Sequence, residues 1–293
     1  MGRFYFPTKS TLVHLRFLYS LYLLPVFLFG LSRTPNLNLI HILFPFILLH
    51  FLIYPASNGY NSFFDKDEGS IGGVKSPPKV DRSLLTTSWI LDILGSIGGF
   101  FIRWEFGLGL ILYGVFSKLY SHPITRFKSK PISSFFIVFF FQGAFVYFLT
   151  RLAVSSVSLV SLMSPKEISS ALFTSFMVGA SYVITQVYQH FEDQLRGDIT
   201  LSVLLGIRGT FIFSGICFIC SMILLITIFS KKVNYIIYFF GFTVPVVLYF
   251  LFWFSKVWSK PSEANFKNTM RMSTLSFLCL SAYFVFLIYL QRV

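Results

Sequence analysis

The chain has 293 residues, of which 55% are hydrophobic and 12% charged, with a mean hydropathy of +0.73 and a formal net charge of +13. A water-soluble domain carries about 25% charged residues, so this composition excludes a soluble globular protein and indicates a polytopic membrane protein. The positive charge requires no nucleic-acid partner, because basic loops at a membrane face and attraction to anionic lipid headgroups and substrates account for it.

Nine apolar segments lie close to the roughly 20 residues that span a bilayer. They predict an all-α, polytopic membrane bundle of about nine transmembrane helices around a central cavity, forming a single integral-membrane domain over residues 1–293. The third and fourth segments are short and adjacent, and can also be read as one interrupted hairpin. The segments are Leu12–Leu31, Leu37–Phe64, Leu84–Phe101, Trp104–Tyr120, Ile132–Val154, Glu167–His190, Leu204–Phe229, Val233–Trp253 and Met270–Leu290.

The distribution of positive charge predicts the orientation of these segments. With nine spans, the N-terminus and the loops after the second, fourth, sixth and eighth spans share one side, which carries most of the 24 lysines and arginines. Basic loops favour the cytoplasmic side of a membrane. We therefore expect an integral protein of the cell (inner) membrane, with these loops in the cytoplasm and membrane lipid around the bundle.

Acidic residues gather in two short windows, Asn58–Gly73 and Tyr188–Gly206, at the ends of the second and sixth apolar segments. Carboxylates are costly near lipid, so their concentration there indicates a functional site. Clustered carboxylates suit hard cations such as Mg²⁺ and, through the cation, a phosphate group. These windows hold six of the 11 acidic residues: Asp65, Asp67, Glu68, Glu192, Asp193 and Asp198.

The spacing within the two windows differs. Asn58, Asn61 and Asp65 follow an i, i+3, i+7 pattern and share one face of a helix. Asp193 and Asp198 are five residues apart, beyond the helical i+4 spacing. They converge only if the helix ends or bulges between them, which Gly197 permits.

A basic stretch follows the fourth apolar segment, from Tyr120 to Lys130, on the same expected side as both acidic windows. Alone it is a typical positive-inside loop. Its Arg126 and Lys128, together with Arg196, are suited to bind phosphate oxygens directly. The three elements together predict a site that clamps a diphosphate through magnesium and basic side chains, with the remainder of the substrate in the bundle.

These residues resemble the UbiA superfamily of intramembrane prenyltransferases over nearly the whole chain. That family has an NxxxDxxxD motif after its second helix, a DxxxD motif after its sixth and a Tyr-Ser, Pro, Arg, Lys pattern after its fourth. The matching residues here are Asn61 and Asp65, then Asp193 and Asp198, and Tyr120, Ser121, Pro123, Arg126 and Lys128.

The chain departs from the family pattern at two places. The last acid of the first motif falls at Gly69, so Asp67 or Glu68 is a candidate replacement. The second motif is one residue longer than DxxxD, which leaves open whether Glu192 or Asp193 pairs with Asp198.

The resemblance implies Mg²⁺-dependent transfer of a prenyl group from an isoprenyl diphosphate to a lipophilic acceptor, aromatic or otherwise, as in the biosynthesis of quinones, pigments and related lipids. It implies catalytic roles for Asp65, Asp193 and Asp198. The candidate magnesium ligands are Asn61, Asp65, Glu68, Asp193 and Asp198, and the candidate diphosphate-binding residues are Tyr120, Arg126, Lys128 and Arg196.

Asp92 is a carboxylate inside the third segment, and a lone intramembrane carboxylate is by default a functional suspect. It is a candidate acceptor contact, with a satisfied structural hydrogen bond as the alternative. Two other functions fit the composition. One is an ion-coupled secondary transporter, which places its charges at broken helices near the midplane. The other is an inactive, lipid-binding membrane scaffold.

Overall fold

The structure, a computed structural model, describes residues 6–292, and within that range the chain is helical except for loops and one isolated bridge between Ile71 and Val74. The first half of the bundle contains α1 (Lys9–Leu15), α2 (Phe17–Ser20), α3 (Leu24–Ser32), α4 (Leu39–Ile47), α5 (Tyr54–Asp65), α6 (Ser83–Phe100) and α7 (Trp104–Ser121). The second half contains α8 (Pro131–Val138), α9 (Val146–Val154), α10 (Leu159–Leu162), α11 (Pro165–Thr185), α12 (His190–Leu195), α13 (Leu201–Ile228), α14 (Val233–Ser259) and α15 (Phe266–Leu290).

Within residues 6–292, eight continuous helical segments are long and apolar enough to cross a membrane by length and composition. The expected all-α membrane bundle is therefore confirmed. The one expected span that is not among these eight is the fourth, Trp104–Tyr120, which corresponds to α7 (Trp104–Ser121), a helix of 18 residues that packs against α6 as a hairpin. The eight segments are Lys9–Ser32, Leu39–Asp65, Ser83–Phe100, Pro131–Val154, Pro165–Leu195, Leu201–Ile228, Val233–Ser259 and Phe266–Leu290.

Local sequence signals explain where several of these helices begin. Pro131 and Pro165 each stand in the first turn of a helix, where the missing N–H costs no hydrogen bond. Thr200 and Asn265 cap α13 and α15, with side chains that accept hydrogen bonds from the backbone N–H three residues later. These caps fix the helix ends nearest the acidic windows.

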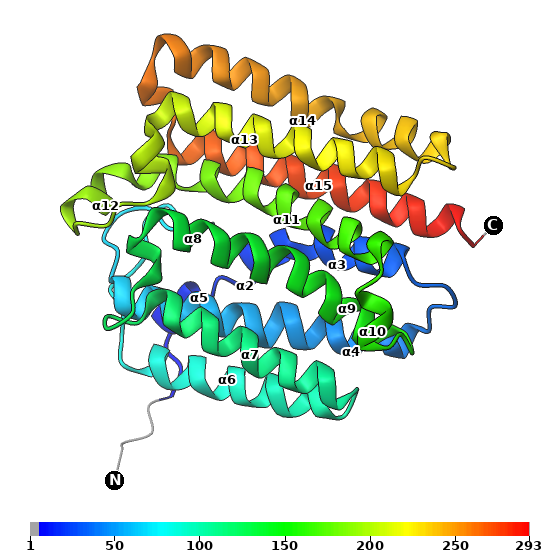
Figure 1. Cartoon of the computed structure of the whole chain (residues 1–293). Helices are drawn as coiled ribbons and strands as arrows, with labels where there is room; N and C mark the ends of the chain where they lie inside the picture. Colours follow the sequence, from blue (N-terminus) through cyan, green and yellow to red (C-terminus); the bar gives the residue numbers. More distant parts are fainter. Residues whose placement is uncertain (1–5, 293) are drawn as a thin grey trace.

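The long helices run side by side and place their ends at two opposite faces (Figure 1). In that view α4–α7 lie on one side of the bundle and α13–α15 on the other, with α3, α8, α9 and α11 between them. Helix α11 packs against α13, α6 packs against α5 and α7, and α14 packs against α15. The ends of α5, α7 and α11 and the start of α13 consequently meet at the end of the bundle that holds α12.

Large apolar side chains fill the interior and also cover the outside. Phe29, Tyr147 and Tyr283 are completely buried, whereas Ile216 and Leu248 on the outer helices are 53% and 61% exposed. Outward apolar residues are stable in this position because lipid chains are as apolar as leucine. The burial pattern is that of a bundle surrounded by hydrocarbon.

Several helices are interrupted within the bundle. The first span breaks at Arg16, which adopts a left-handed conformation with φ of 50° between α1 and α2. Two π-helical segments, η2 (Leu48–Ile53) and η4 (Phe139–Phe145), join α4 to α5 and α8 to α9. Helix α13 kinks at Gly206, whose φ of 66° favours glycine. Such interruptions are frequent where a helix bundle forms a functional site.

Candidate active site

The first acidic window follows the expected helical face. Helix α5 carries Asn61 and Asp65 toward the interior and ends at Asp65, because Lys66 takes a left-handed conformation with φ of 50°. Asn58, one turn earlier, donates a hydrogen bond from Nδ2 to Ser20 Oγ at 3.1 Å. The i, i+3, i+7 pattern therefore does produce one polar face at the end of the second span.

The second acidic window forms a short reverse turn. Helix α12 ends at Leu195, Gly197 has a φ of 74°, and the Asp198 backbone N–H donates to the Asp193 carbonyl oxygen at 2.8 Å. The side chains of Asp193 and Asp198 are 9% and 3% exposed. The turn at Gly197 thus brings both carboxylates to the same face, as their five-residue spacing requires.

The basic loop lies between these two windows. Arg126 adopts a left-handed conformation, and Lys128, in the 3₁₀ turn η3 (Phe127–Ser129), has a side chain only 9% exposed. The hydroxyl of Tyr120, at the end of α7, lies 2.8 Å from the hydroxyl of Tyr182 on α11, which also contacts Ser134 of α8. These hydroxyl contacts tie the base of the loop to α11.

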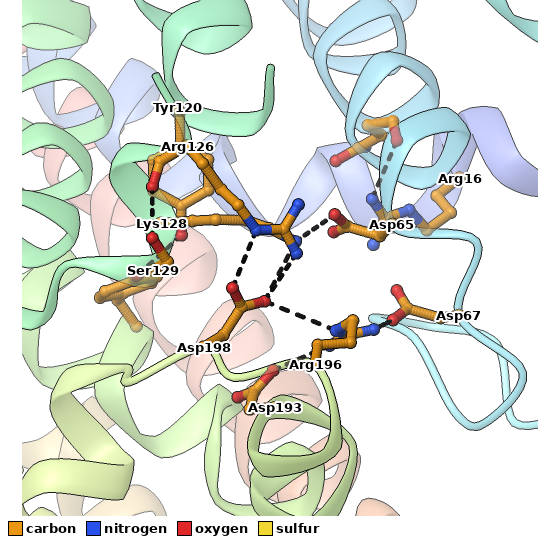
Figure 2. Close-up of polar contacts among 12 residues, drawn as sticks. Arg16, Asp65, Asp67, Tyr120, Arg126, Lys128, Ser129, Asp193, Arg196 and Asp198 are labelled. Atoms are coloured by element: carbon orange, nitrogen blue, oxygen red, sulfur yellow. Dashed lines mark hydrogen bonds and ion pairs between the residues drawn. The ribbon is translucent and has the colours of Figure 1, made fainter. Parts of the chain in front are cut away.

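Asp198 is the centre of a convergent set of ion pairs (Figure 2). Arg126 donates to it from Nε and Nη2, at 2.9 and 2.8 Å, in a bidentate pair. Lys128 bridges the two acidic windows, since its ammonium pairs with Asp65 and lies 3.9 Å from Asp198 Oδ2. Its hydrogen bonds to Asp198 raise the pKa of Arg126, so this guanidinium stays charged at all physiological pH values.

Arg196 makes the second bridge between the windows. Its guanidinium pairs with Asp67 and with Asp193 at 2.8 Å, and its Nε lies 3.5 Å from Asp198 Oδ2. Burial alone lowers the pKa of Arg196, but the surrounding carboxylates outweigh it and the pKa is raised. Four carboxylates thus face three cations, so the cluster lies close to electrical balance before any ligand enters.

The carboxylate and amide oxygens at this site are suited to bind magnesium, although lysine and arginine side chains neutralise the carboxylates in this structure. Among residues 6–292, no group of three or more His, Cys, Asp or Glu side chains lies close enough to form a preassembled metal cage. The carboxylates of Asp65, Asp67, Asp193 and Asp198 and the amide of Asn61 all face one cavity. Carboxylate and amide oxygens are the ligands that Mg²⁺ takes, often with retained water and substrate phosphates.

Glu192 occupies the space that Gly69 leaves open. A Cβ added to Gly69 would lie 1.5 Å from Glu192 Oε1, so the carboxylate stands where a side chain at position 69 would begin. Glu192 Oε2 is buried and has no hydrogen-bond partner in the described part of the chain. The second window thereby places a carboxylate directly against the backbone position at which the family motif has its third acid.

The site opens into a cavity of about 640 Å³ that extends into the bundle. Its deeper walls come from α3, α7, α11, α13, α14 and α15, through side chains such as Val26, Phe218, Phe250 and Leu280. A cavity of this size is typical of small-molecule sites, which are mostly apolar with a few convergent polar groups. The polar end and the apolar depth suit a ligand with a charged head and a hydrocarbon tail.

The structure places most, but not all, of the expected residues at this cavity. Asn61, Asp65, Tyr120, Lys128, Asp193, Arg196 and Asp198 line it, and Arg126 is held against Asp198. Glu68 is exposed and does not line the cavity, whereas its neighbour Asp67 does and pairs with Arg196. Asp67 therefore replaces Glu68 as the candidate ligand, because the turn after α5 points Glu68 to the surface.

Asp92 also lies away from the cavity. Its carboxylate pairs with Lys118 of α7, whose ammonium stacks 4.3 Å above the Trp89 ring. A buried carboxylate with a cationic partner needs no substrate to satisfy it. The position of Asp92 favours the structural hydrogen bond over the acceptor contact.

Arg16 is a cavity residue that the sequence reasoning missed. It lies beside Asp65 (Figure 2), and its Nη2 donates to the Asn58 carbonyl oxygen at 3.2 Å, while its buried Nε has no hydrogen-bond partner within residues 6–292. A lone arginine inside the first apolar segment was the available signal, since intramembrane charges mark functional sites. The α1–α2 break at this residue turns the guanidinium inward.

The fold and the site define a class of protein: an intramembrane helical bundle with two acidic windows at the mouth of an apolar cavity. The model of the UbiA prenyltransferase family matches residues 22–275, and the chain belongs to this family. A comparison of the sequence with curated proteins found no match.

Solved structures of UbiA homologues share the fold. The apo structure of a UbiA homologue from Aeropyrum pernix K1 aligns with a TM-score of 0.70 at 17% identity, covering 95% of this chain and 99% of that chain. A UbiA homologue from Archaeoglobus fulgidus bound to GPP and Mg²⁺ aligns with a TM-score of 0.66 at 19% identity, covering 96% and 100%. The same homologue bound to DMAPP and Mg²⁺ aligns with a TM-score of 0.66, again at 19% identity, covering 96% and 99%.

Proposed function

We propose that this protein transfers a prenyl group from an isoprenyl diphosphate to an aromatic or other lipophilic acceptor inside the membrane, in a reaction that depends on Mg²⁺. The observation that carries the proposal is the convergence of Asp65, Asp67, Asp193 and Asp198 with Lys128 and Arg196 at the mouth of one apolar cavity. The GPP and DMAPP complexes of the Archaeoglobus homologue support a prenyl diphosphate as donor. The apolar depth of the cavity fits its hydrocarbon chain.

In this proposal the four carboxylates and Asn61 hold the metal, because all five side chains line the cavity. Bound magnesium acts as a Lewis acid that stabilises the charge developing on the departing diphosphate. Binding requires the carboxylates to exchange their lysine and arginine partners for the metal. This exchange needs no backbone movement, because the partners of Asp65 and Asp198 include Lys128 and Arg126, whose side chains are long and have many rotatable bonds.

The released cations supply the rest of the diphosphate site. Lys128, Arg126 and Arg196 lie at the same mouth and are suited to bind phosphate oxygens once they leave the carboxylates. Fixed positive charge aimed at the leaving group lowers the barrier to breaking the carbon–oxygen bond. The allylic cation that remains is attacked by a nucleophilic atom of the acceptor, which then loses a proton to the diphosphate or to water, and aromatic faces of the cavity are available to stabilise the cation.

The test is turnover by the purified protein in detergent. Geranyl, farnesyl and geranylgeranyl diphosphates are offered with a panel of aromatic acceptors, once with Mg²⁺ and once with EDTA. We expect pyrophosphate and a prenylated product only with Mg²⁺. Asp65→Ala and Asp193→Ala should abolish transfer while the protein remains folded and inserted, and undiminished turnover in both variants would refute the mechanism.

A further inference from the structure

A polar patch lies deep in the cavity, on the side formed by α5, α7 and η4. It consists of Tyr54, Tyr113 and Gln142, all of which line the cavity. Tyr54 stands 11 residues before Asp65 on the same helix, which places it about 16 Å deeper in the bundle. The patch is thus separated from the acidic mouth by several helical turns, and the site described above makes no use of it.

The patch continues a polar stripe along α5 and α7. Tyr54 and Ser57 extend the face that carries Asn61 and Asp65 by two further turns. Ser57 Oγ accepts a hydrogen bond from Ser117 of α7 at 2.6 Å, so these two hydroxyls satisfy each other. The stripe therefore leads from the diphosphate end of the cavity to Tyr54.

Tyr54 has an unused hydroxyl. The residue lines the cavity but is only 2% exposed, and its buried hydroxyl has no hydrogen-bond partner among residues 6–292. Its ring lies 5.7 Å from that of Tyr113, whose hydroxyl contacts the Gln142 side chain. A buried polar group without a partner is destabilising, and native structures retain one mainly where a ligand or function requires it.

Two rare backbone features bring these side chains together. The π-helical segment η2 ends at Ile53, directly before Tyr54, and Gln142 lies inside the π-helical segment η4. An extra residue in a helical turn rotates the following side chains by about 100° relative to a regular helix. π-helical turns are uncommon and concentrate at functional sites.

The opposite wall has a different chemistry. Hydroxyls there are already satisfied, because Ser214 donates to the Ala180 carbonyl oxygen and Thr243 to that of Phe239. The rest of that wall is largely apolar, with Phe218, Ile219, Val247, Phe250, Leu251 and Phe277. A hydrocarbon chain is best accommodated against this wall, which leaves the polar wall for the second substrate.

We propose that Tyr54 and Gln142 bind a polar substituent of the acceptor, on the side of the acceptor ring remote from the atom that is prenylated. The proposal rests on the proposed function and deepens it. The magnesium-bound diphosphate and the acceptor ring together fill the depth between Asp65 and Tyr54. Acceptors with a hydroxyl or carbonyl at that remote position are therefore selected over equally sized acceptors without one.

The test compares binding of 2,7-naphthalenediol with that of 7-methyl-2-naphthol, which differs only by a methyl in place of the remote hydroxyl. Affinities are measured by calorimetry on the detergent-purified protein with Mg²⁺ and inorganic pyrophosphate present, so that no prenyl group is transferred during the titration. We expect the wild type to bind the diol about tenfold more tightly, as one additional buried hydrogen bond implies. Tyr54→Phe and Gln142→Leu should each reduce this ratio toward one.

Tyr60→Phe is the matched control, because Tyr60 is a buried tyrosine on the same helix that packs on Phe64 and Trp89 and does not line the cavity. It should retain the wild-type ratio. Equal or absent binding of both compounds by the wild type would overturn the proposal, as would an unchanged ratio in Tyr54→Phe and Gln142→Leu. Magnesium-dependent binding of farnesyl diphosphate alone, measured in the same preparations, tests the proposed function separately and confirms that each variant is folded.

Discussion

Removing the carboxylate of Asp198 and removing that of Asp193 should have different effects on stability, because the arginines beside them keep different numbers of carboxylate partners. Asp198→Ala takes from Arg126 its sole carboxylate ion-pair partner among residues 6–292, and weakens the neutralisation of Lys128 and Arg196. In Asp193→Ala, Arg196 keeps both Asp67 and Asp198. The two substitutions remove the same group from the same cluster, so they form a matched pair.

The expected loss of unfolding free energy depends on how exposed to solvent the arginines are that lose a carboxylate partner. Removing one member of a fully buried ion pair costs about 3–5 kcal/mol, whereas an exposed pair contributes about 0–1 kcal/mol. The side chains of Arg126 and Arg196 are 24% and 22% exposed, so part of the penalty is relieved by solvent. We expect a loss of about 2–3 kcal/mol for Asp198→Ala and about 1 kcal/mol or less for Asp193→Ala.

The assay is thermal unfolding of the detergent-purified variants in EDTA, followed by tryptophan fluorescence. At about 2–4 °C per kcal/mol, Tm should fall by about 5–10 °C for Asp198→Ala and by less than half of that for Asp193→Ala. Equal losses, or a larger loss for Asp193→Ala, would show that Asp198 is not the centre of the ion-pair cluster.

Three further substitutions test separate parts of the account. Arg16→Gln removes a cavity cation that has no carboxylate partner among residues 6–292, and should weaken Mg²⁺-dependent binding of farnesyl diphosphate by about tenfold in calorimetry; unchanged affinity would exclude Arg16 from the diphosphate site. Gly69→Asp should lower Tm and turnover because its Cβ displaces the Glu192 carboxylate and places a second negative charge beside it, and adding Glu192→Ala should restore both; no rescue would show that the two positions do not share one carboxylate site. Asp92→Leu should lower the free energy of unfolding by about 3 kcal/mol, because it leaves Lys118 without its carboxylate, and the double variant with Lys118→Leu should lose much less. Turnover per folded molecule should be unchanged in both variants, and lost turnover in the stable double variant would show that Asp92 belongs to the acceptor site.

Much of the architecture follows from local sequence signals. Segment length and hydropathy predicted the spans, and the i, i+3, i+7 pattern predicted the inward face of α5 that carries Asn61 and Asp65. The five-residue spacing of Asp193 and Asp198 predicted a break between them, which the structure makes at Gly197. Each of these features depends on residues close together in the chain, where helical geometry fixes the outcome.

Contacts between segments far apart in the chain could not be predicted from these local sequence patterns. The sequence left open whether Asp67 or Glu68 faces the site, because the two residues are adjacent and the backbone conformation of the turn after α5 decides which side chain points inward. It also could not show that Glu192 fills the space beside Gly69, since 123 positions separate them and only packing of α12 against the loop brings them together. The π-helical segment η4 was equally hidden, because no residue type marks such a turn and Gln142 alone has an ordinary helical pattern.

The central claim is that the two acidic windows act as one magnesium–diphosphate site. A double-mutant cycle of Asp65→Asn and Asp198→Asn tests it, with the affinity for farnesyl diphosphate measured by calorimetry in Mg²⁺ and in EDTA. Because both carboxylates contribute to a single bound complex, we predict that each single variant loses most of the Mg²⁺-dependent affinity and that the double variant loses little more. Independent, additive losses, or full Mg²⁺-dependent binding in either single variant, would contradict the account.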